Sequence, residues 1–277
     1  MRSKVVTAGL ILAAIILLLW TLFPFYWTII TSLKHRAEIT LTPPTFYPHT
    51  FTFKNYIEGL FGAFPPMLAY FRNSFTECFG GAAIALLIGI PLAYAGARYN
   101  FKGKKDIFFT VLTFRFLPPA CVVIPIFMFA RVFGLIDTQF LMACLLAAMN
   151  LPIVAWVMMS YFREIPRELE ESFMIDGYSE FQAFLKVTLP LSRPGLIAVT
   201  LLIVALSYAE FLFSSILTSS PAAKPLTVGI SEYMGGEWGY YWGRIAAVTL
   251  VGFIPLLIIY LIVRKHLVRG LTFGVIR

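Results

Sequence analysis

The residues that could do chemistry in this chain gather in one polar segment, residues 168–195. The segment holds five acidic and two basic residues and lies between two long apolar stretches. Its closely spaced carboxylates (Glu168, Glu170, Glu171 and Asp176) have no histidine or cysteine among them. A membrane-embedded enzyme would need a clustered nucleophile and base, or metal ligands, and the sequence shows neither. The segment is better suited to bind another molecule than to catalyse a reaction.

Metal and phosphate chemistry are not indicated elsewhere in the sequence. The histidines His35, His49 and His266 are scattered without ligand spacing. The three cysteines all lie in apolar stretches, where we expect small buried hydrophobic residues and no disulfide. The segment Phe-Lys-Gly-Lys-Lys at residues 101–105 lacks the glycine spacing and the preceding strand of a phosphate-binding loop. We therefore expect no metal and no cofactor bound by this chain.

The elements that must position the polar segment are membrane-spanning helices. Of 277 residues, 59% are hydrophobic and only 13% are charged, which is typical of an integral membrane protein. A span needs about 20 mostly apolar residues. Six stretches meet that need, namely residues 5–32, 75–97, 107–129, 140–162, 194–217 and 242–263. The first is too long for a signal peptide and lacks a cleavage pattern. We predict one all-α domain of six transmembrane helices over residues 1–277.

The basic residues predict the orientation. Of the 22 bases, 14 lie in the N-terminus, the loop after the second span, the polar segment or the C-terminal tail. Lysine and arginine are retained on the cytoplasmic side during insertion, so both termini and the polar segment are expected in the cytoplasm. This bias and anionic lipid account for the net charge of +8, and nucleic acid is not an expected partner.

The polar segment predicts two short helices joined at a glycine corner. Pro166 suits a first helical turn, and the glutamates after it lie near the positive end of the helix dipole. Gly177 supplies a left-handed residue, and Ser179 with Gln182 forms a capping-box pattern for a second helix, expected to stop before Pro190. Each helix has an apolar face, formed by Leu169, Phe173 and Met174 on the first and by Phe181, Phe184 and Leu185 on the second.

Glu171, Gly177 and the run Val187-Thr188-Leu189-Pro190 follow one another at a fixed spacing. This pattern resembles the cytoplasmic EAA loop of permease subunits of bacterial ABC importers. That resemblance implies that the loop, residues 163–193, couples the membrane helices to an ATPase. Ser172 and Phe173 stand where the family usually has two alanines. The implied coupling residues are Glu170, Glu171, Ser172, Phe173, Asp176, Gly177, Leu189 and Pro190. An amphipathic hairpin lying on the lipid headgroups remains the alternative.

Further matches are similar to carbohydrate importers related to the smaller maltose permease subunit. They include Asn55-Tyr56, Asn73-Ser74, Leu151-Pro152, Ile175-Asp176-Gly177 and Glu210-Phe211-Leu212. The resemblance implies a binding-protein-dependent sugar permease of the bacterial inner membrane. It also implies a second permease subunit, two ATPase subunits that use ATP and Mg, and an extracytoplasmic solute-binding protein. The tail ends Phe273-Gly274-Val275-Ile276-Arg277, where the family usually has small residues with a lysine.

Polar residues inside the predicted spans are candidates for the translocation pathway. Ionisable groups at bilayer depth are costly and usually face a protein interior or a cavity, which singles out Arg115 and Glu210. Asn150, Ser207 and Tyr208 offer hydrogen bonds and an aromatic face to a sugar. Internal contacts that fix helix packing are an equally good interpretation. Glu77 is expected near the outer interface of the second span.

The glycine- and aromatic-rich loop 218–241 is expected outside, either in contact with the binding protein or as an interfacial re-entrant loop. The other transport hypothesis is a secondary transporter that needs no ATPase. Such a protein would show paired repeats with intramembrane acids and interrupted helices. The sequence shows no visible repeat and one lone glutamate in that position, Glu210.

Overall fold

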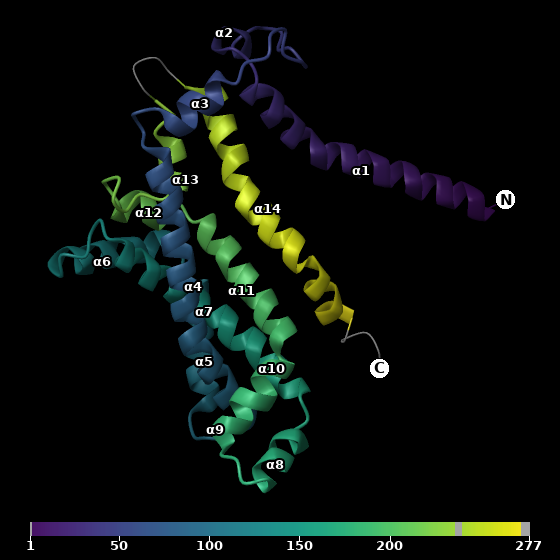
Figure 1. Cartoon of the computed structure of the whole chain (residues 1–277), viewed down its shortest axis with the longest axis vertical. Helices are drawn as coiled ribbons and strands as arrows, with labels where there is room; N and C mark the ends of the chain where they lie inside the picture. Colours follow the sequence, from purple (N-terminus) through teal and green to yellow (C-terminus); the bar gives the residue numbers. More distant parts are fainter. Residues whose placement is uncertain (1, 236–239, 273–277) are drawn as a thin grey trace. The chain divides into compact units, whose positions relative to one another are not determined.

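The computed structural model describes residues 2–235 and 240–272, and every regular element in those residues is helical. The chain divides into two compact units. Unit 1 comprises Met1–Leu68 and Gly229–Ile254, and unit 2 comprises Ala69–Val228 and Pro255–Arg277. The elements are α1 (Arg2–Ser32), α2 (Arg36–Ile39), α3 (Lys54–Phe61), α4 (Met67–Arg98), α5 (Lys104–Phe116), α6 (Pro119–Val132), α7 (Gln139–Glu164), α8 (Glu168–Ile175), α9 (Glu180–Ala183), the π-helix η1 (Phe184–Thr188), α10 (Leu189–Leu191), α11 (Arg193–Tyr208), α12 (Leu212–Leu217), α13 (Leu226–Ser231) and α14 (Trp242–Thr272) (Figure 1).

Within the described residues, four helices are long and apolar enough to cross a membrane. They are Gly9–Ser32 within α1, the whole of α4, the whole of α7, and Trp242–Leu261 within α14. Two bent helix pairs bring the number to six if each pair is one span. The first pair is α5 with α6, and the second joins Glu180–Leu191 to α11. These helices confirm the predicted all-α membrane architecture.

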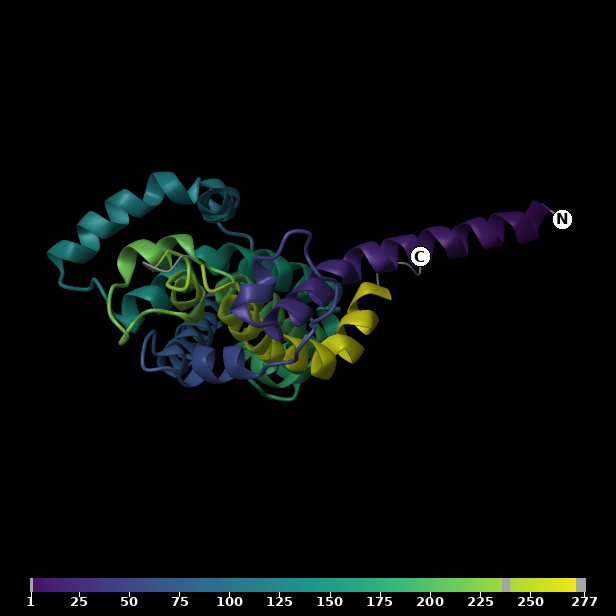
Figure 2. The ribbon, with the colours of Figure 1, turned by 90° about the horizontal axis from the view of Figure 1, so that it is seen from above.

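The predicted third stretch, residues 107–129, is divided between two helices. α5 and α6 meet at an angle of 98°, and Figure 2, which views α5 nearly end-on, shows α6 leaving it sideways. The break falls at Leu117, whose backbone is extended (ψ 126°). A residue before proline is disfavoured in the helical region, and Pro118 and Pro119 follow Leu117. The sequence therefore contains the signal for this bend.

The predicted fifth stretch, residues 194–217, is also divided. α11 ends at Tyr208 and α12 begins at Leu212. The carboxylate of Glu210 accepts hydrogen bonds from the amides of Phe213 (2.7 Å) and Ser214 (3.1 Å). These amides belong to the first turn of α12 and have no partner within the helix. The acidic residue therefore starts a new helix at this position.

The core of unit 2 lies where α4, α7 and α11 pack together. Small residues allow α4 to approach α7 closely. A Cβ added at Gly81 would lie 2.9 Å from Leu146 Cβ, and one at Gly89 would lie 2.6 Å from Val154 Cγ1. Small residues at such positions are typical of helix packing in membranes. Buried residues such as Met158, Phe162 and Ile203 fill the core beside them.

Unit 1 is held together by polar contacts around α3. Asn55 Nδ2 donates to the carbonyl oxygens of Ser32 (2.9 Å) and Lys34 (2.8 Å), which fixes the chain after α1. Glu58 pairs with Arg244, at the start of α14, at 2.5 Å. The first turn of α14 and the chain that follows α1 are therefore anchored to the same short helix.

Candidate functional site

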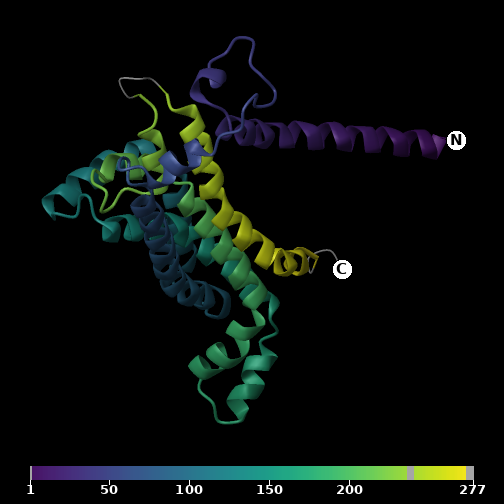
Figure 3. The same ribbon diagram turned by 45° about the horizontal axis from the view of Figure 1, so that its top comes forward.

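The polar segment folds as a hairpin, residues 168–192, at one end of unit 2, with α12 at the opposite end (Figures 1 and 3). α8 forms its first arm, and Gly177 turns the chain with φ +91°. The predicted capping box is present, because Ser179 Oγ accepts from the Gln182 amide (3.3 Å) and Gln182 Oε1 accepts from the Ser179 amide (2.9 Å). The predicted corner between two short helices is therefore confirmed.

The second arm does not stop before Pro190, and this part of the prediction is wrong. α9 continues through η1 and α10 to Ser192, whose amide donates to the carbonyl of Thr188 at 3.0 Å. In the π-helical turn, the Leu189 amide donates to the carbonyl of Phe184, five residues earlier. Proline has no amide to donate and clashes with the carbonyl four residues before it in a regular helix. The wider turn just before Pro190 accommodates the ring without ending the arm.

The two faces of the hairpin differ in exposure. Phe184 is buried, with its ring centroid 4.5 Å from that of Tyr94 on α4. In contrast, Ile175 is 85% exposed and Phe181 is 67% exposed. Large apolar residues exposed beside charges are typical of an interaction surface. The hairpin is thus attached to unit 2 on one side and leaves apolar side chains open on the other.

The predicted coupling residues fall into three groups by exposure. Glu171, Ser172, Asp176 and Gly177 are exposed, and Phe173, Leu189 and Pro190 are half-buried. The Phe173 ring stacks on Tyr178, with centroids 4.1 Å apart and planes 13° apart. This stacking fills the corner of the hairpin, where the family pattern has alanine. Glu170 is set apart from the others because it is only 3% exposed.

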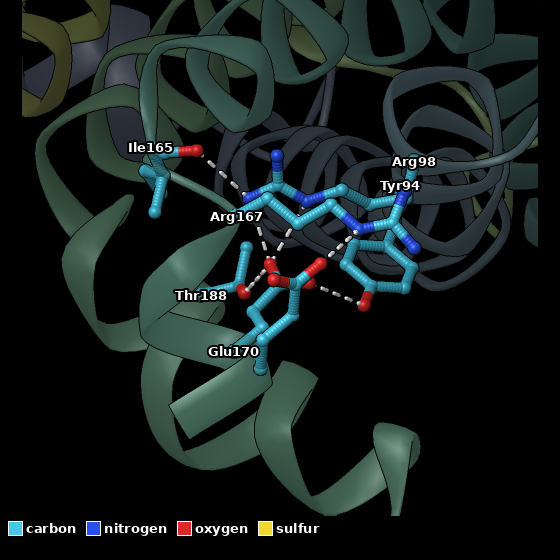
Figure 4. A network of polar contacts seen from close by, with 7 residues as sticks. Tyr94, Arg98, Ile165, Arg167, Glu170 and Thr188 are labelled. Carbon is cyan, nitrogen blue, oxygen red and sulfur yellow. Dashed lines mark hydrogen bonds and ion pairs between the residues drawn. The ribbon is translucent and has the colours of Figure 1, made fainter. Parts of the chain in front are cut away.

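Glu170 accepts hydrogen bonds from two directions inside unit 2 (Figure 4). Its Oε1 lies 2.7 Å from Nη2 and 2.9 Å from Nε of Arg98, the last residue of α4. Tyr94, one turn earlier on α4, donates to Oε2 at 3.1 Å. Thr188, on the second arm, donates its hydroxyl to Oε1. Arg98 Nη2 also donates to the carbonyl of Ile165 at 3.0 Å, just after α7.

A second contact between the hairpin and the end of α4 involves Tyr99, the residue after α4. Hydrogen bonding to Glu180 on α9, together with burial, raises the pKa of Tyr99 to about 12. On the exposed side, Arg167 and Glu171 pair at 3.1 Å, one helical turn apart, with side chains 58% and 53% exposed. Exposed pairs of this kind contribute about 0.3–0.5 kcal/mol. The strongly held charges of the hairpin are therefore on its buried side.

Two of the predicted pathway residues are brought together. Asn150 on α7 donates to Ser207 Oγ on α11 at 2.9 Å and to the carbonyl of Leu146 at 2.8 Å. Both side chains are buried. Asn150 Oδ1 has no hydrogen-bond partner among the described residues. Tyr208 is half-buried beside Phe75 of α4, with ring centroids 6.1 Å apart. These contacts link α7 to α11, and α11 to α4.

The ionisable pathway candidates lie in different settings. Glu210 is half-buried and caps α12, and Thr227 donates to its backbone carbonyl at 2.8 Å. Arg115 is exposed on α5, where it lines a cavity of about 420 Å³ together with residues of α6 and α7. Glu77, expected near the outer interface of the second span, is 2% exposed inside unit 2. The rotation of α4 about its axis decides this burial, and the sequence does not specify it.

The opposite end of unit 2 contains polar residues that the sequence analysis missed as a group. Asn73 donates to the carbonyls of Pro221 and Lys224, both at 2.9 Å, and accepts from Gln139 at 2.7 Å. Asp137, with φ +62°, accepts from the amides of Ser219 (2.8 Å) and Ser220 (2.9 Å). We call residues 73, 137 and 139 with 219–224 the loop clamp. Of these residues, the sequence analysis singled out only Asn73, as part of the pair Asn73-Ser74.

Burial would raise the pKa of Asp137, but hydrogen bonds from Ser220 and Ser219 outweigh it and hold that pKa below its usual range. The predicted outer loop, residues 218–241, begins in the loop clamp. Residues 236–239 of this loop lie outside the described residues. Of its aromatic residues, Tyr233 is buried in unit 1 and donates its hydroxyl to the carbonyl of Gly59 at 2.8 Å.

Residues 86–273 match the model of a protein family described as "Binding-protein-dependent transport system inner membrane component". The chain is 34% identical to the sulfoquinovosyl glycerol transport system permease protein SmoH of Agrobacterium fabrum, over 95% of this chain and 91% of that protein. It is 31% identical to the trehalose/maltose transport system permease protein MalG of Thermococcus litoralis, over 97% and 96% of the two chains. Similarity extends along nearly the full length of each relative.

Solved structures with the same fold were also found. A chain of a bacterial ABC transporter involved in the import of the acidic polysaccharide alginate superposes with a TM-score of 0.80, covering 96% of this chain and 98% of that one at 23% identity. A chain of the MetNI methionine ABC transporter gives a TM-score of 0.57 at 22% identity, covering 74% and 99%. The helical arrangement is therefore one that other membrane importers adopt.

Proposed function

The chain belongs to the family of binding-protein-dependent transport system inner membrane components, and from that premise we infer that it is the permease subunit of an ATP-driven sugar importer. The relatives support a sugar or sugar-like solute, because they are named for sulfoquinovosyl glycerol, trehalose and maltose. Family membership argues against the alternative of a secondary transporter that works without an ATPase.

The expected assembly pairs this chain with a second permease, with which it forms the pathway. Two ATPase subunits hydrolyse ATP with Mg, and an extracytoplasmic binding protein delivers the solute. In this assignment the hairpin and both termini face the cytoplasm, as the distribution of bases predicts. Asn150, Ser207, Tyr208, Glu210 and Arg115 remain the candidates for contact with the solute or the pathway.

One observation supports the coupling role above all others. The hairpin exposes Ile175 and Phe181 next to the carboxylates of Glu171 and Asp176, while its other side is packed into unit 2. An amphipathic hairpin that only rests on lipid would need one apolar face, turned toward the headgroups. This hairpin has a second apolar face that is already buried against α4, so its exposed face is suited to a protein cleft.

The glycine corner provides the sharpest test. Gly177 has φ +91°, and a Cβ added there would have no heavy atom of this chain within 4 Å apart from its chain neighbours. A residue with a Cβ is strained in this conformation by about 1 kcal/mol. Gly177→Asp should therefore leave the folded subunit in the membrane but spoil docking. We expect normal membrane level, reduced co-purification of the ATPase, and loss of uptake of a sugar that the binding protein is shown to bind.

Gly134→Asp is the matched control. Gly134 also has positive φ (+66°) and open space, but it lies in the loop between α6 and α7, away from the hairpin. Lys102→Asp adds a control in the other basic loop. Both should retain the ATPase. Wild-type uptake with the ATPase still attached in Gly177→Asp would refute the coupling role and favour the interfacial hairpin. A screen of sugars against the binding protein would identify the solute.

A further inference from the structure

Glu170 belongs to the exposed acidic run by sequence, yet its side chain is among the most deeply buried charges of unit 2. The Arg98 and Glu170 side chains are only 7% and 4% exposed. A buried charge is costly unless it is paired and hydrogen-bonded. The carboxylate has an ion pair and two hydroxyl donors, so its charge is well compensated. A residue buried in this way cannot be a direct docking contact.

The four side chains come from elements that the function requires to move together. Tyr94 and Arg98 lie in the last turns of α4, Glu170 lies on the first arm of the hairpin, and Thr188 lies on the second arm. One carboxylate therefore ties the two arms to each other and both arms to α4. Arg98 also binds the carbonyl of Ile165, where the chain leaves α7. The end of a spanning helix and the hairpin share a single polar centre (Figure 4).

We propose that Arg98 and Glu170, with Tyr94 and Thr188, are positioning residues that make the hairpin and α4 move as one body, so that displacement of the hairpin by an ATPase reaches the membrane helices through this contact. The proposal rests on the coupling role proposed above. The planar guanidinium presents Nε and Nη2 to the carboxylate and a further bond to Ile165, which restricts rotation as well as separation. Lysine provides only a point charge.

The test measures relative motion. Spin labels are placed at Leu185→Cys on the hairpin and Leu87→Cys on α4, both exposed, in a chain whose three natural cysteines are replaced by alanine. The distance between the labels is measured in the purified complex with the ATPase, without nucleotide and with Mg-ATP trapped by vanadate. In the otherwise unchanged chain, we expect the same narrow distribution in both states, because the hairpin and α4 move together.

Glu170→Gln keeps the shape of the side chain but removes the charge and replaces one accepting oxygen by an NH2 donor. Arg98→Lys keeps the charge but removes the planar fork. In each variant we expect the label distance to broaden without nucleotide and to shift when Mg-ATP is trapped. We also expect the rate of ATP hydrolysis by the complex to lose its dependence on the solute-loaded binding protein. Glu164→Gln makes the same chemical change at an exposed carboxylate at the end of α7 and should change neither quantity.

Two results would overturn the proposal. One is a distance in Glu170→Gln as narrow and as independent of nucleotide as in the unchanged chain. The other is a nucleotide-dependent shift already present in the unchanged chain, which would mean that the hairpin and α4 move separately. Absence of the ATPase from every purified sample, including the unchanged chain, would instead refute the coupling role itself. Thermal melting of each variant separates loss of the link from loss of the fold.

Discussion

The hairpin end and the loop clamp end of unit 2 are both held by polar side chains, but the groups differ. At the hairpin end, a charged pair, Arg98 with Glu170, joins elements through side chain to side chain contacts. At the loop clamp, Asn73 and Asp137 bind mostly backbone groups of residues 219–224. The first arrangement joins a helix to a hairpin, and the second fixes the path of a loop.

This difference relates to what each end has to do. Side chain to backbone hydrogen bonds satisfy a loop that has no helical partners of its own, and they give it one conformation. A buried ion pair adds little net stability compared with apolar packing, but breaking it is strongly destabilising. The contact between the hairpin and α4 therefore depends on both partners of the pair. In the proposed coupling role, the hairpin end transmits a displacement, whereas the backbone contacts of the loop clamp hold residues 219–224 in place.

The largest expected effect comes from removing one member of the ion pair. Glu170→Ala leaves Arg98 buried without a counterion, and this should lower the free energy of unfolding by about 3–5 kcal/mol. Thermal melting of the purified subunit in detergent measures the loss. Glu164→Ala, an exposed residue, should stay within about 0.5 kcal/mol of the unchanged chain. Equal melting of the two variants would show that the buried ion pair at the hairpin end does not stabilise the fold.

The next effect should come from the loop clamp. Asn73→Ala removes two donated hydrogen bonds and one accepted bond, all at 2.7–2.9 Å, from a side chain that is 0% exposed. At about 1 kcal/mol for each bond, we expect a loss of about 2–3 kcal/mol. The same variant should leave ATPase co-purification unchanged. Loss of the ATPase from Asn73→Ala would show that the two ends are not separable.

A smaller effect isolates the charge of Asp137. Asp137→Asn keeps an oxygen for the amides of Ser219 and Ser220, so we expect a loss of about 1 kcal/mol at pH 7. Because the pKa of Asp137 is lowered in the folded protein, its stabilisation is complete above the unfolded-state pKa of about 3.9 and is lost as the pH falls through the lowered value. The difference in melting temperature between the two proteins should therefore be smaller at about pH 3 than at pH 7. A gap that stays constant with pH would exclude the charge as its source.

The smallest effect is expected at the exposed pair beside the hairpin corner. Arg167→Ala breaks the contact of Arg167 with Glu171, in which both side chains are more than half exposed. Pairs of this kind contribute about 0.3–0.5 kcal/mol. Melting of this variant in low and high salt gives the comparison with Glu170→Ala. A loss as large as that of Glu170→Ala would mean that burial does not distinguish the two acidic positions.

Local features of the hairpin were predictable because they depend on near neighbours in the sequence. The helix over Glu168–Ile175, the positive φ of Gly177 and the capping box of Ser179 all follow from local rules. The all-α membrane fold followed from the apolar stretches. The bend at Leu117 also had a local signal in Pro118, but length and hydropathy alone hid it.

What the sequence did not reveal depends on contacts between distant residues. The pairing of Glu170 with Arg98 joins positions 72 residues apart. The sequence groups Glu170 with exposed neighbours, and only the packing of α8 against α4 shows that it is buried. Likewise, Asn73 meets residues about 150 positions away. Glu210 was recognised as an intramembrane acid, but its capping of α12 required the break after Tyr208 to be known.

The π-helical turn at Phe184–Thr188 makes the length of the second arm critical. Such a turn contains one residue more than the corresponding α-helical turn, which turns by about 100° for each residue. Phe184 and Thr188 both face the interior across this turn, one toward Tyr94 and the other toward Glu170. Loss of any single residue between them would restore a regular helix, in which the ring of Pro190 clashes with the carbonyl four residues before it. Insertions and deletions should therefore be far less tolerated here than substitutions, even at its exposed positions.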